Sequence, residues 1–275
     1  MKIITPLRFP GGKSKVIKKY LEPLFPEFDG DFFEPFVGGG SVSLWMAQKY
    51  PNKKIYINDI NYNLYCFWKT LKENPESLIK ELHKIRDKYN PNDEIAGKSL
   101  LNVMNDRLEY ESDPYEIAIA FYVLNKISFS GLTEHGTLSK DAYKKTYNHH
   151  NINRLKDIYP LMKNFIITSE DYIKLYEQTT ENDFIFLDPP YEIGEALYGK
   201  KGKIHTDFDH NRFAIETKEL LCKWMITYND NDPIRNRFID YNIVDREYAY
   251  CMSFETDESG NKHTRKKNEL IIMNY

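Results

Sequence analysis

Short apolar runs recur along the chain, and each ends at polar or turn-forming residues. Residues 184–187, with the sequence FIFL, form such a run and stop at an Asp-Pro-Pro-Tyr segment. Runs this short, and rich in β-branched or aromatic side chains, predict strands that are covered on both faces. The pattern predicts strands at residues 32–37, 54–58, 164–168, 184–187, 223–228, 242–247 and 269–273.

Apolar residues at helical spacing lie between several of these strands, at residues 14–24, 41–48, 171–178 and 212–222. Strands that alternate with helices predict a doubly wound α/β fold. The last two strands differ, because the polar segment that joins them, residues 256–267, is too short for a crossover helix. We therefore expect a hairpin there, and a mostly parallel, seven-stranded sheet with one antiparallel strand.

A long segment without a strand pattern separates the second and third strands. Residues 75–89 and 114–126 carry apolar side chains at helical spacing, and the polar, aromatic and basic sequence FSGLTEHGTLSKDAYKKTYNHH follows them. This sequence suits an irregular loop or a small hairpin. The chain is thus predicted to form a sheet domain from residues 1–61 and 160–275, with residues 62–159 as an inserted, mostly helical lobe.

Composition adds few constraints. The 275 residues carry a net charge of −3, which gives no global indication of a nucleic-acid partner, although basic residues cluster at several places. Three cysteines without CxxC spacing are expected to be reduced and buried. The first residues lack the apolar core of a signal peptide, and no apolar stretch has membrane-spanning length, so we expect a cytoplasmic protein without membrane contact.

The segment after residues 184–187 places candidate chemistry at the end of a strand. Pro189 and Pro190 have no amide hydrogen and a fixed φ, so neither a sheet ladder nor a helix can continue through them. Asp188 and Tyr191 should therefore lie on a stiff loop at the carboxyl end of a buried strand. Ligands bind at that edge in open α/β sheets.

Two glycine-rich turns suggest a nucleotide or a related cofactor. Residues 38–40 (GGG) lie between a predicted strand and a helix, and Asp59 ends the next strand, where a carboxylate can bind ribose hydroxyls. These features suit any adenosine-containing cofactor, but Ser43 replaces the last glycine of the dinucleotide fingerprint. Residues 12–14 match the end of a phosphate-binding loop, yet Leu7 stands where that motif needs glycine, which disfavours a nucleoside triphosphatase.

Taken together and in order, these motifs resemble a known family. RFPGGK, FFEPFVGGGS, INDIN, ITSEDY, LDPPY and a closing TRKKNEL, with the inserted lobe between them, resemble the Dam family of DNA adenine methyltransferases over nearly the whole chain. The resemblance implies methyl transfer from S-adenosylmethionine to the exocyclic amine (N6) of adenine in double-stranded DNA, with the target base flipped out of the helix. It implies no metal ion, and we expect a monomer.

The resemblance also assigns roles to individual residues. Asp188 and the backbone carbonyl of Pro189 would accept the two hydrogens of the adenine amine, and Tyr191 would stack on the flipped base. The cofactor-binding residues would be Phe9, Lys13, Phe36, Gly38, Gly40, Asp59, Asp171 and Asp188. For Phe9 and Phe36 the alternative is core packing, and for Asp171 it is a helix cap.

The DNA-binding residues implied by the resemblance are Arg8, Phe129, Ser130, Leu132, Glu134, Lys144, Lys145, Arg265 and Lys266. Phe129 and Ser130 match a pair that wedges into the duplex beside the flipped base. GATC-specific members read NGLCRYN here, so Ser130 replaces an asparagine and Glu134 an arginine that reads guanine. A carboxylate is repelled by the acceptors of guanine, so we expect a principal site other than GATC. His149 and His150 lack a third ligand at metal-binding spacing, which favours a surface role.

Other functions remain open from the residues alone. A cytosine-N4 methyltransferase could use the same acceptors, a catalytically silent relative could bind DNA without methylating it, and a nicotinamide dehydrogenase shares the glycine loop. The Pro-Pro-Tyr form of the motif favours adenine, and intact Asp188 and Tyr191 favour catalysis.

Overall fold

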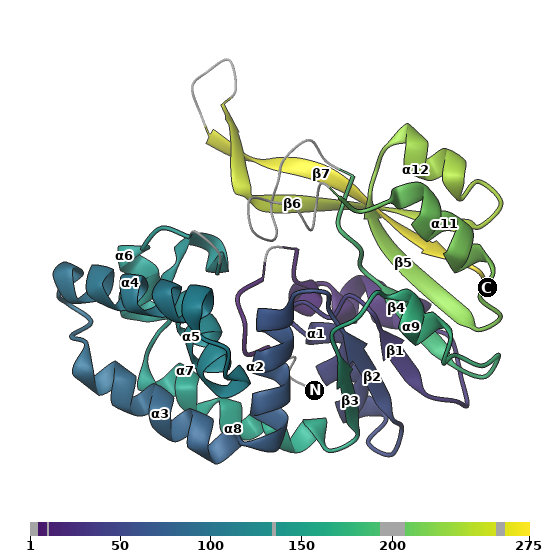
Figure 1. The fold of residues 1–275 in the computed structure, drawn as a ribbon. Helices are drawn as coiled ribbons and strands as arrows, with labels where there is room; N and C mark the ends of the chain where they lie inside the picture. Colours follow the sequence, from purple (N-terminus) through teal and green to yellow (C-terminus); the bar gives the residue numbers. More distant parts are fainter. Residues whose placement is uncertain (1–4, 10, 134–135, 193–206, 257–261) are drawn as a thin grey trace.

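The sheet has the predicted size and polarity. The computed structural model describes residues 5–9, 11–133, 136–192, 207–256 and 262–275. The strands are β1 (Phe32–Glu34), β2 (Ile55–Asn58), β3 (Phe165–Thr168), β4 (Phe184–Leu187), β5 (Lys223–Asn229), β6 (Asn242–Thr256) and β7 (Lys262–Met273). They form one seven-stranded sheet in the order β3-β2-β1-β4-β5-β7-β6, and only β7 runs antiparallel to its neighbours (Figure 1). The expectation of a mostly parallel α/β sheet with one antiparallel strand is confirmed.

A hydrophobic cluster covers each face of the sheet, and successive side chains of each strand point into the two clusters alternately. In β4, Phe184 and Phe186 belong to one hydrophobic cluster, whereas Ile185 and Leu187 belong to another. The helices α1 (Ser41–Lys49) and α2 (Tyr62–Glu73) contribute to the first cluster, and α9 (Ile173–Tyr176), α11 (His210–Lys218) and α12 (Asp232–Arg237) contribute to the second. This two-sided covering explains why the β4 sequence is continuously apolar.

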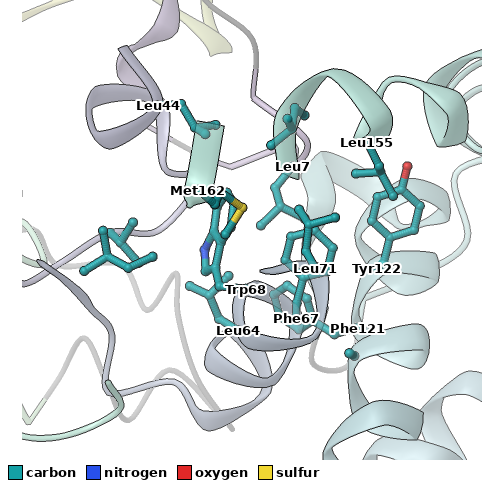
Figure 2. Close-up of a cluster of buried hydrophobic side chains, with 14 of the residues drawn as sticks. Leu7, Leu44, Leu64, Phe67, Trp68, Leu71, Phe121, Tyr122, Leu155 and Met162 are labelled. Atoms are coloured by element: carbon teal, nitrogen blue, oxygen red, sulfur yellow. The ribbon is translucent and has the colours of Figure 1, made fainter. Parts of the chain in front are cut away.

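The segment between β2 and β3 is helical, as the sequence predicts. Besides α2 it contains α3 (Pro75–Lys88), α4 (Glu94–Tyr110), α5 (Pro114–Ile127), η4 (Phe129–Gly131), α6 (Lys140–Lys145), α7 (His149–Asn153), α8 (Leu155–Ile158) and η5 (Tyr159–Met162). These helices gather beside the sheet, and α2 lies between the two parts (Figure 1). Leu64, Phe67, Trp68 and Leu71 of α2 pack between Leu44 of α1 and the side chains of α5 (Figure 2). One buried cluster therefore joins the sheet to the helices. Among the described residues, no helix is long and apolar enough to cross a membrane.

Several boundaries differ from the sequence-based expectation. The segment predicted as one helix at residues 14–24 consists of short turns: the 3-10 helix η1 (Lys13–Lys15), the π-helix η2 (Ile17–Leu21) and the 3-10 helix η3 (Glu22–Leu24). Pro23 cannot donate the backbone hydrogen bond that a continuous α-helix needs there. The helix α11 begins earlier than predicted, because the side chain of Asp209 accepts hydrogen bonds from the amides of residues 211 and 212.

The hairpin of β6 and β7 is longer than predicted. The segment 256–267 was expected to be a loop, but β6 continues to Thr256, β7 begins at Lys262, and these two residues pair. The two strands project beyond the rest of the sheet as a ribbon (Figure 1). Polar residues are compatible with such a ribbon, because an antiparallel ladder requires only backbone donors and acceptors and one face can meet water.

The junction between the sheet and the helices predicts a stability effect. The ring of Phe67 is fully buried and stacks on Tyr122 of α5, with ring centroids 5.7 Å apart. Phe67→Ala should therefore lower the free energy of unfolding by about 3–5 kcal/mol. Tyr110→Ala, at a ring that is 79% exposed, is the matched control and should change it by less than about 0.5 kcal/mol. Urea unfolding measures both, and equal losses would contradict the shared core.

Candidate functional site

The candidate site lies where parallel strands end. The glycine loop follows β1, Asp59 follows β2, Asp171 lies shortly after β3, and Asp188 follows β4. Because these strands are parallel, their carboxyl ends meet at one edge of the sheet. The strands β1 and β4 are neighbours at the centre, where the chain order of the sheet reverses, and open α/β sheets bind ligands at this point.

The glycine loop needs glycine for steric reasons. Gly38 and Gly40 have φ of +44° and +65°, in the left-handed region that favours glycine. A Cβ atom on Gly40 would lie 2.6 Å from Cζ2 of Trp68, and the indole nitrogen of Trp68 donates a hydrogen bond of 3.1 Å to the carbonyl of Gly38. The loop is thus clamped against α2, with Gly38 and Gly40 buried and Gly39 partly exposed.

Asp59 is oriented by the same loop. Its Oδ2 accepts a hydrogen bond of 3.1 Å from the amide of Gly38, and its Oδ1 accepts one of 3.0 Å from the amide of Asn61, the cap of α2. Burial raises the pKa of Asp59 to about 6. At neutral pH this side chain is an ionised and fixed acceptor, suited to neighbouring hydroxyl groups.

Phe9 and Phe36 take part in packing, as the alternative interpretation expects. Phe9 is partly buried and lies over the glycine loop, so closely that a Cβ on Gly38 would be 2.9 Å from its Cε1. Phe36 is also partly buried, and its ring centroid lies 5.4 Å from that of Tyr172 and 5.9 Å from that of Phe213. Both rings stay partly exposed, next to the glycine loop.

Asp171 lies just before α9 and bonds to its first turn, a contact of the kind that its alternative interpretation expects. Its Oδ1 accepts a hydrogen bond of 3.1 Å from the amide of Ile173 at the start of α9. Its Oδ2 forms a 2.9 Å ion pair with Arg212 of α11, and both side chains are about half exposed. The arginine was not predicted, because it lies far from Asp171 in the sequence.

Asp188 lies in a cluster of buried charges. Its Oδ1 accepts hydrogen bonds from the hydroxyl of Thr227, at 2.7 Å, and from the ammonium of Lys13, at 2.8 Å. The side chain of Lys13 is only 4% exposed, whereas that of Asp188 is 23% exposed. The enclosed site raises the pKa of Asp188, against the opposing effect of Lys13. Burial alone would lower the pKa of Lys13, but the nearby carboxylates raise it, so Lys13 remains a cation.

A second buried carboxylate completes this cluster. Oε1 of Glu269, on β7, lies 3.3 Å from the ammonium of Lys13 and accepts a hydrogen bond from the hydroxyl of Tyr191. Oε2 of Glu269 pairs with Arg246, the residue opposite it on β6. Glu269 and Arg246 are both almost fully buried. Lys13 also donates a 2.9 Å hydrogen bond to the Tyr191 hydroxyl, so three segments distant in the sequence meet here.

Glu34 is a third acidic group that the sequence did not single out. It ends β1, is 3% exposed, and accepts hydrogen bonds from the amide and the hydroxyl of Ser43. Burial raises the pKa of Glu34 to about 8, and the negative charge of Asp188 adds to this increase. Glu34 is therefore largely protonated at neutral pH and contributes little charge to the site.

Arg8 ties the N-terminal segment to the end of α5. Its guanidinium donates a 2.9 Å hydrogen bond to the carbonyl of Ser128, and its backbone amide and carbonyl bond with the side chain of Asn125. The loop that follows α5 is closed by a bridge between Ser128 and Leu138 and presents Phe129, which is 59% exposed. This agrees with the small hairpin that the sequence allowed.

The predicted wedge residues lie at the start of this loop, in η4. Ser130, next to Phe129, has a φ of +54°, an uncommon and strained value for a residue other than glycine. Leu132 is partly exposed. Glu134, to which the sequence assigns base reading, lies outside the described residues, so its predicted contact stays a prediction.

The remaining basic candidates are at the surface or not described in detail. Lys144 and Lys145 lie exposed in the last turn of α6, and Lys145 pairs with Asp141 at 2.8 Å. Arg265 and Lys266 belong to β7, but their side chains lie outside the described part. His149 contacts His83 and Asp87 at the surface, and within the described ranges no group of three or more candidate ligands could hold a metal ion.

Comparison with known proteins gives a consistent result. The family model for D12 class N6 adenine-specific DNA methyltransferases matches residues 9–252. The chain is 30% identical to the type II methyltransferase M.MjaIII of Methanocaldococcus jannaschii, over 98% of both chains. It is also 30% identical to the DNA N-6-adenine-methyltransferase of Escherichia phage P1, over 78% of this chain and 27% of the phage protein. The DNA adenine methylase of Haemophilus influenzae is 26% identical, over 67% and 63% of the two chains.

The glycine loop supplies a direct test of its geometry. Gly40→Ala should destabilise the protein by about 1–3 kcal/mol, because it combines a left-handed backbone with overlap of the new Cβ and the Trp68 ring. Gly39→Ala is the matched control: its φ lies outside the strained region, and its nearest contact would be 3.1 Å. Thermal unfolding of both variants is the measurement. A Gly40→Ala protein as stable as Gly39→Ala would show that the loop does not hold this conformation.

Proposed function

Because the chain belongs to the D12 class of N6 adenine-specific DNA methyltransferases, we propose that S-adenosylmethionine is its methyl donor and Asp188 its catalytic residue. The protein transfers a methyl group to N6 of adenine in DNA. The observation that carries the proposal is the meeting of a glycine loop, Asp59 and Asp188 at the ends of three adjacent parallel strands.

The residues at this edge fit the donor. The clamped glycine loop carries no side chains and holds Asp59 through the amide of Gly38, and Asp59 is a fixed carboxylate suited to the two ribose hydroxyls. Phe36 and Phe9 provide apolar surface beside the loop, and Asp171 lies after the neighbouring strand. When bound, the cofactor supplies an electrophilic methyl group. The protein supplies the acceptors for the target amine and the surface that holds the base.

Asp188 addresses the weak nucleophilicity of the target amine. The lone pair of that nitrogen is delocalised into the adenine ring. A carboxylate and the carbonyl of Pro189 that accept its two hydrogens favour a geometry in which the lone pair points toward the methyl group. The loop after β4 holds both acceptors in place before reaction, which is electrostatic preorganisation. Asp188 is the only one of these two groups that carries charge, so it should dominate the effect.

Tyr191 is proposed to receive the flipped base. The ammonium of Lys13 lies 5.2 Å from the centre of its ring, and its hydroxyl is held by Lys13 and Glu269. The ring is therefore fixed, and it is partly exposed. Stacking of a base on a fixed aromatic ring is worth about 1–3 kcal/mol.

The helical segment 62–159 is proposed to recognise double-stranded DNA. The loop with Phe129 and the strained Ser130 suits insertion beside the flipped base, because an exposed aromatic side chain on a pinned loop can fill the space the base leaves. We propose that four basic residues contact phosphates: Lys144, Lys145, Arg265 and Lys266. We also propose that a monomer suffices for catalysis. We also propose a target site other than GATC, because Glu134 replaces the arginine that reads guanine in GATC-specific members.

The assignment of Asp188 is tested by substitution. Asp188→Ala should lower the rate of methyl transfer by about a hundredfold or more, because a preorganised charged acceptor is lost. It should leave cofactor affinity and folding largely intact, since Lys13 keeps Glu269 as its partner at 3.3 Å. Transfer of a tritiated methyl group measures the rate, and calorimetry measures cofactor binding. Near-normal turnover would refute the role of Asp188, and an inactive but DNA-binding wild type would instead identify a silent relative.

Salt dependence tests the phosphate contacts. Each phosphate neutralised steepens the slope of log affinity against log salt by about 0.9, so DNA affinity should fall steeply despite the net negative charge. Lys144→Ala combined with Lys145→Ala should flatten the slope by about one unit per lost contact. Lys174→Ala, at an exposed lysine of α9, is the control for loss of charge alone. Fluorescence anisotropy on duplex DNA measures the slopes; equal slopes for all three proteins would exclude the two lysines from the interface.

A further inference from the structure

The two oxygens of Asp188 have different surroundings. Both donors to this carboxylate, the hydroxyl of Thr227 and the ammonium of Lys13, bond to Oδ1. Within the described parts of the chain, no donor lies at hydrogen-bond distance from Oδ2, and the side chain is 23% exposed. One oxygen is therefore fixed by the protein, and the other remains open to a substrate.

We propose that Thr227 and Glu269 are positioning residues, which hold Asp188 by Oδ1 so that Oδ2 accepts a hydrogen of the target amine. This inference rests on the catalytic role proposed for Asp188. Thr227 acts directly, and Glu269 acts through Lys13.

Thr227 is placed by the pairing of β4 with β5. Leu187 of β4 pairs with Ile226 of β5, so the next residues, Asp188 and Thr227, lie side by side. Thr227 is fully buried between Ile226 and Tyr228, and its hydroxyl donates the 2.7 Å bond to Oδ1. A hydrogen bond to an ionised acceptor is stronger than a neutral one, and it fixes the orientation of the carboxylate.

Glu269 controls how strongly Lys13 acts on Asp188. The ammonium of Lys13 lies 2.8 Å from Asp188 and 3.3 Å from Glu269, so two carboxylates share one cation. Arg246 satisfies the second oxygen of Glu269. Without the charge of Glu269, Lys13 would pair with Asp188 alone, and the carboxylate would become a weaker acceptor.

The charged groups that face Asp188 act on its acidity in opposite directions. The enclosed site raises the pKa of Asp188; Lys13 and the hydrogen bond from Thr227 lower it, and Glu269 raises it. Glu34 on β1 is a further acidic neighbour, and it is largely protonated at neutral pH. Asp188 accepts the amine hydrogen only when ionised, so methyl transfer should be lost as the pH falls through its pKa.

Two near-isosteric variants test the inference with opposite expected shifts. Thr227→Val removes a bond that stabilises the ionised form, so the acid limb of the pH–rate profile should move to higher pH and turnover at the plateau should fall about tenfold. Thr227→Ser should restore both. Glu269→Gln removes a charge that disfavours ionisation, so the acid limb should move to lower pH, with a plateau reduced severalfold because the acceptor is weaker. Single-turnover methyl transfer across pH, with cofactor Kd measured separately, provides the data.

The outcomes separate this inference from the proposed function. If Asp188→Ala is inactive but the acid limbs of Thr227→Val and Glu269→Gln stay in place or move together, the inference is wrong and the proposed function stands. If Asp188→Ala is active, the proposed function fails whatever the other variants do. Should Glu269→Gln not fold, because the buried Arg246 loses its ion pair with Glu269, the combination of Arg246→Gln and Glu269→Gln removes both charges and must show the same shift to lower pH.

Discussion

A buried cation, the ammonium of Lys13, fixes the relative positions of the segments that form the site. It comes from the N-terminal segment and meets the carboxylates of Asp188 after β4 and Glu269 on β7. A buried charge is tolerated only when it is paired, and removal of one partner is strongly destabilising. The N-terminal turn, the loop after β4 and the start of the apolar part of β7 are therefore constrained by one another. Because two carboxylates share the cation, either one can change its contacts without leaving Lys13 unpaired.

The antiparallel strand makes this arrangement possible. Parallel strands present their carboxyl ends at one edge of the sheet, and β7 runs in the opposite direction, so the residue before its apolar run arrives at that same edge. Glu269 pairs with Asn229 at the carboxyl end of β5 and with Arg246 on β6. The antiparallel direction of β7 thus places the buried carboxylate of Glu269 at the edge of the sheet where Asp188 lies. The glycine loop after β1 and Asp59 after β2 lie on the other side of β4 from Glu269.

The sequence predicts the parts of the site that depend on local signals. The apolar runs identify all seven strands, the prolines identify the loop after β4, and the glycines identify a turn whose φ values other residues rarely adopt. The residues that position Asp188 are different, because Thr227 and Glu269 are brought to the site only by strand pairing. A threonine between two apolar residues carries no sign of its partner. Glu269 gave a weak sign of its role, because it is a charged residue at the start of a predicted buried strand.

Other differences have similar causes. The assignment of Asp171 to the cofactor by resemblance stays a prediction, but its ion pair with Arg212 on α11 was not foreseen, because only tertiary packing supplies this partner. The hairpin was predicted, but its length was not, because polar strands lack the apolar alternation used to find them. The helix predicted at residues 14–24 is broken into short turns, since apolar spacing does not report the missing amide of Pro23.

The most direct test of the account is a crystal structure of the protein with a duplex and a non-reactive analogue of the methyl donor. If Asp188 is held by one oxygen and accepts the target amine with the other, Oδ1 should keep its contacts with Thr227 and Lys13. Oδ2 should then lie about 3 Å from N6 of a flipped adenine. A flipped adenine whose N6 contacts Oδ1, or an Asp188 that has exchanged Thr227 for other partners, would contradict it.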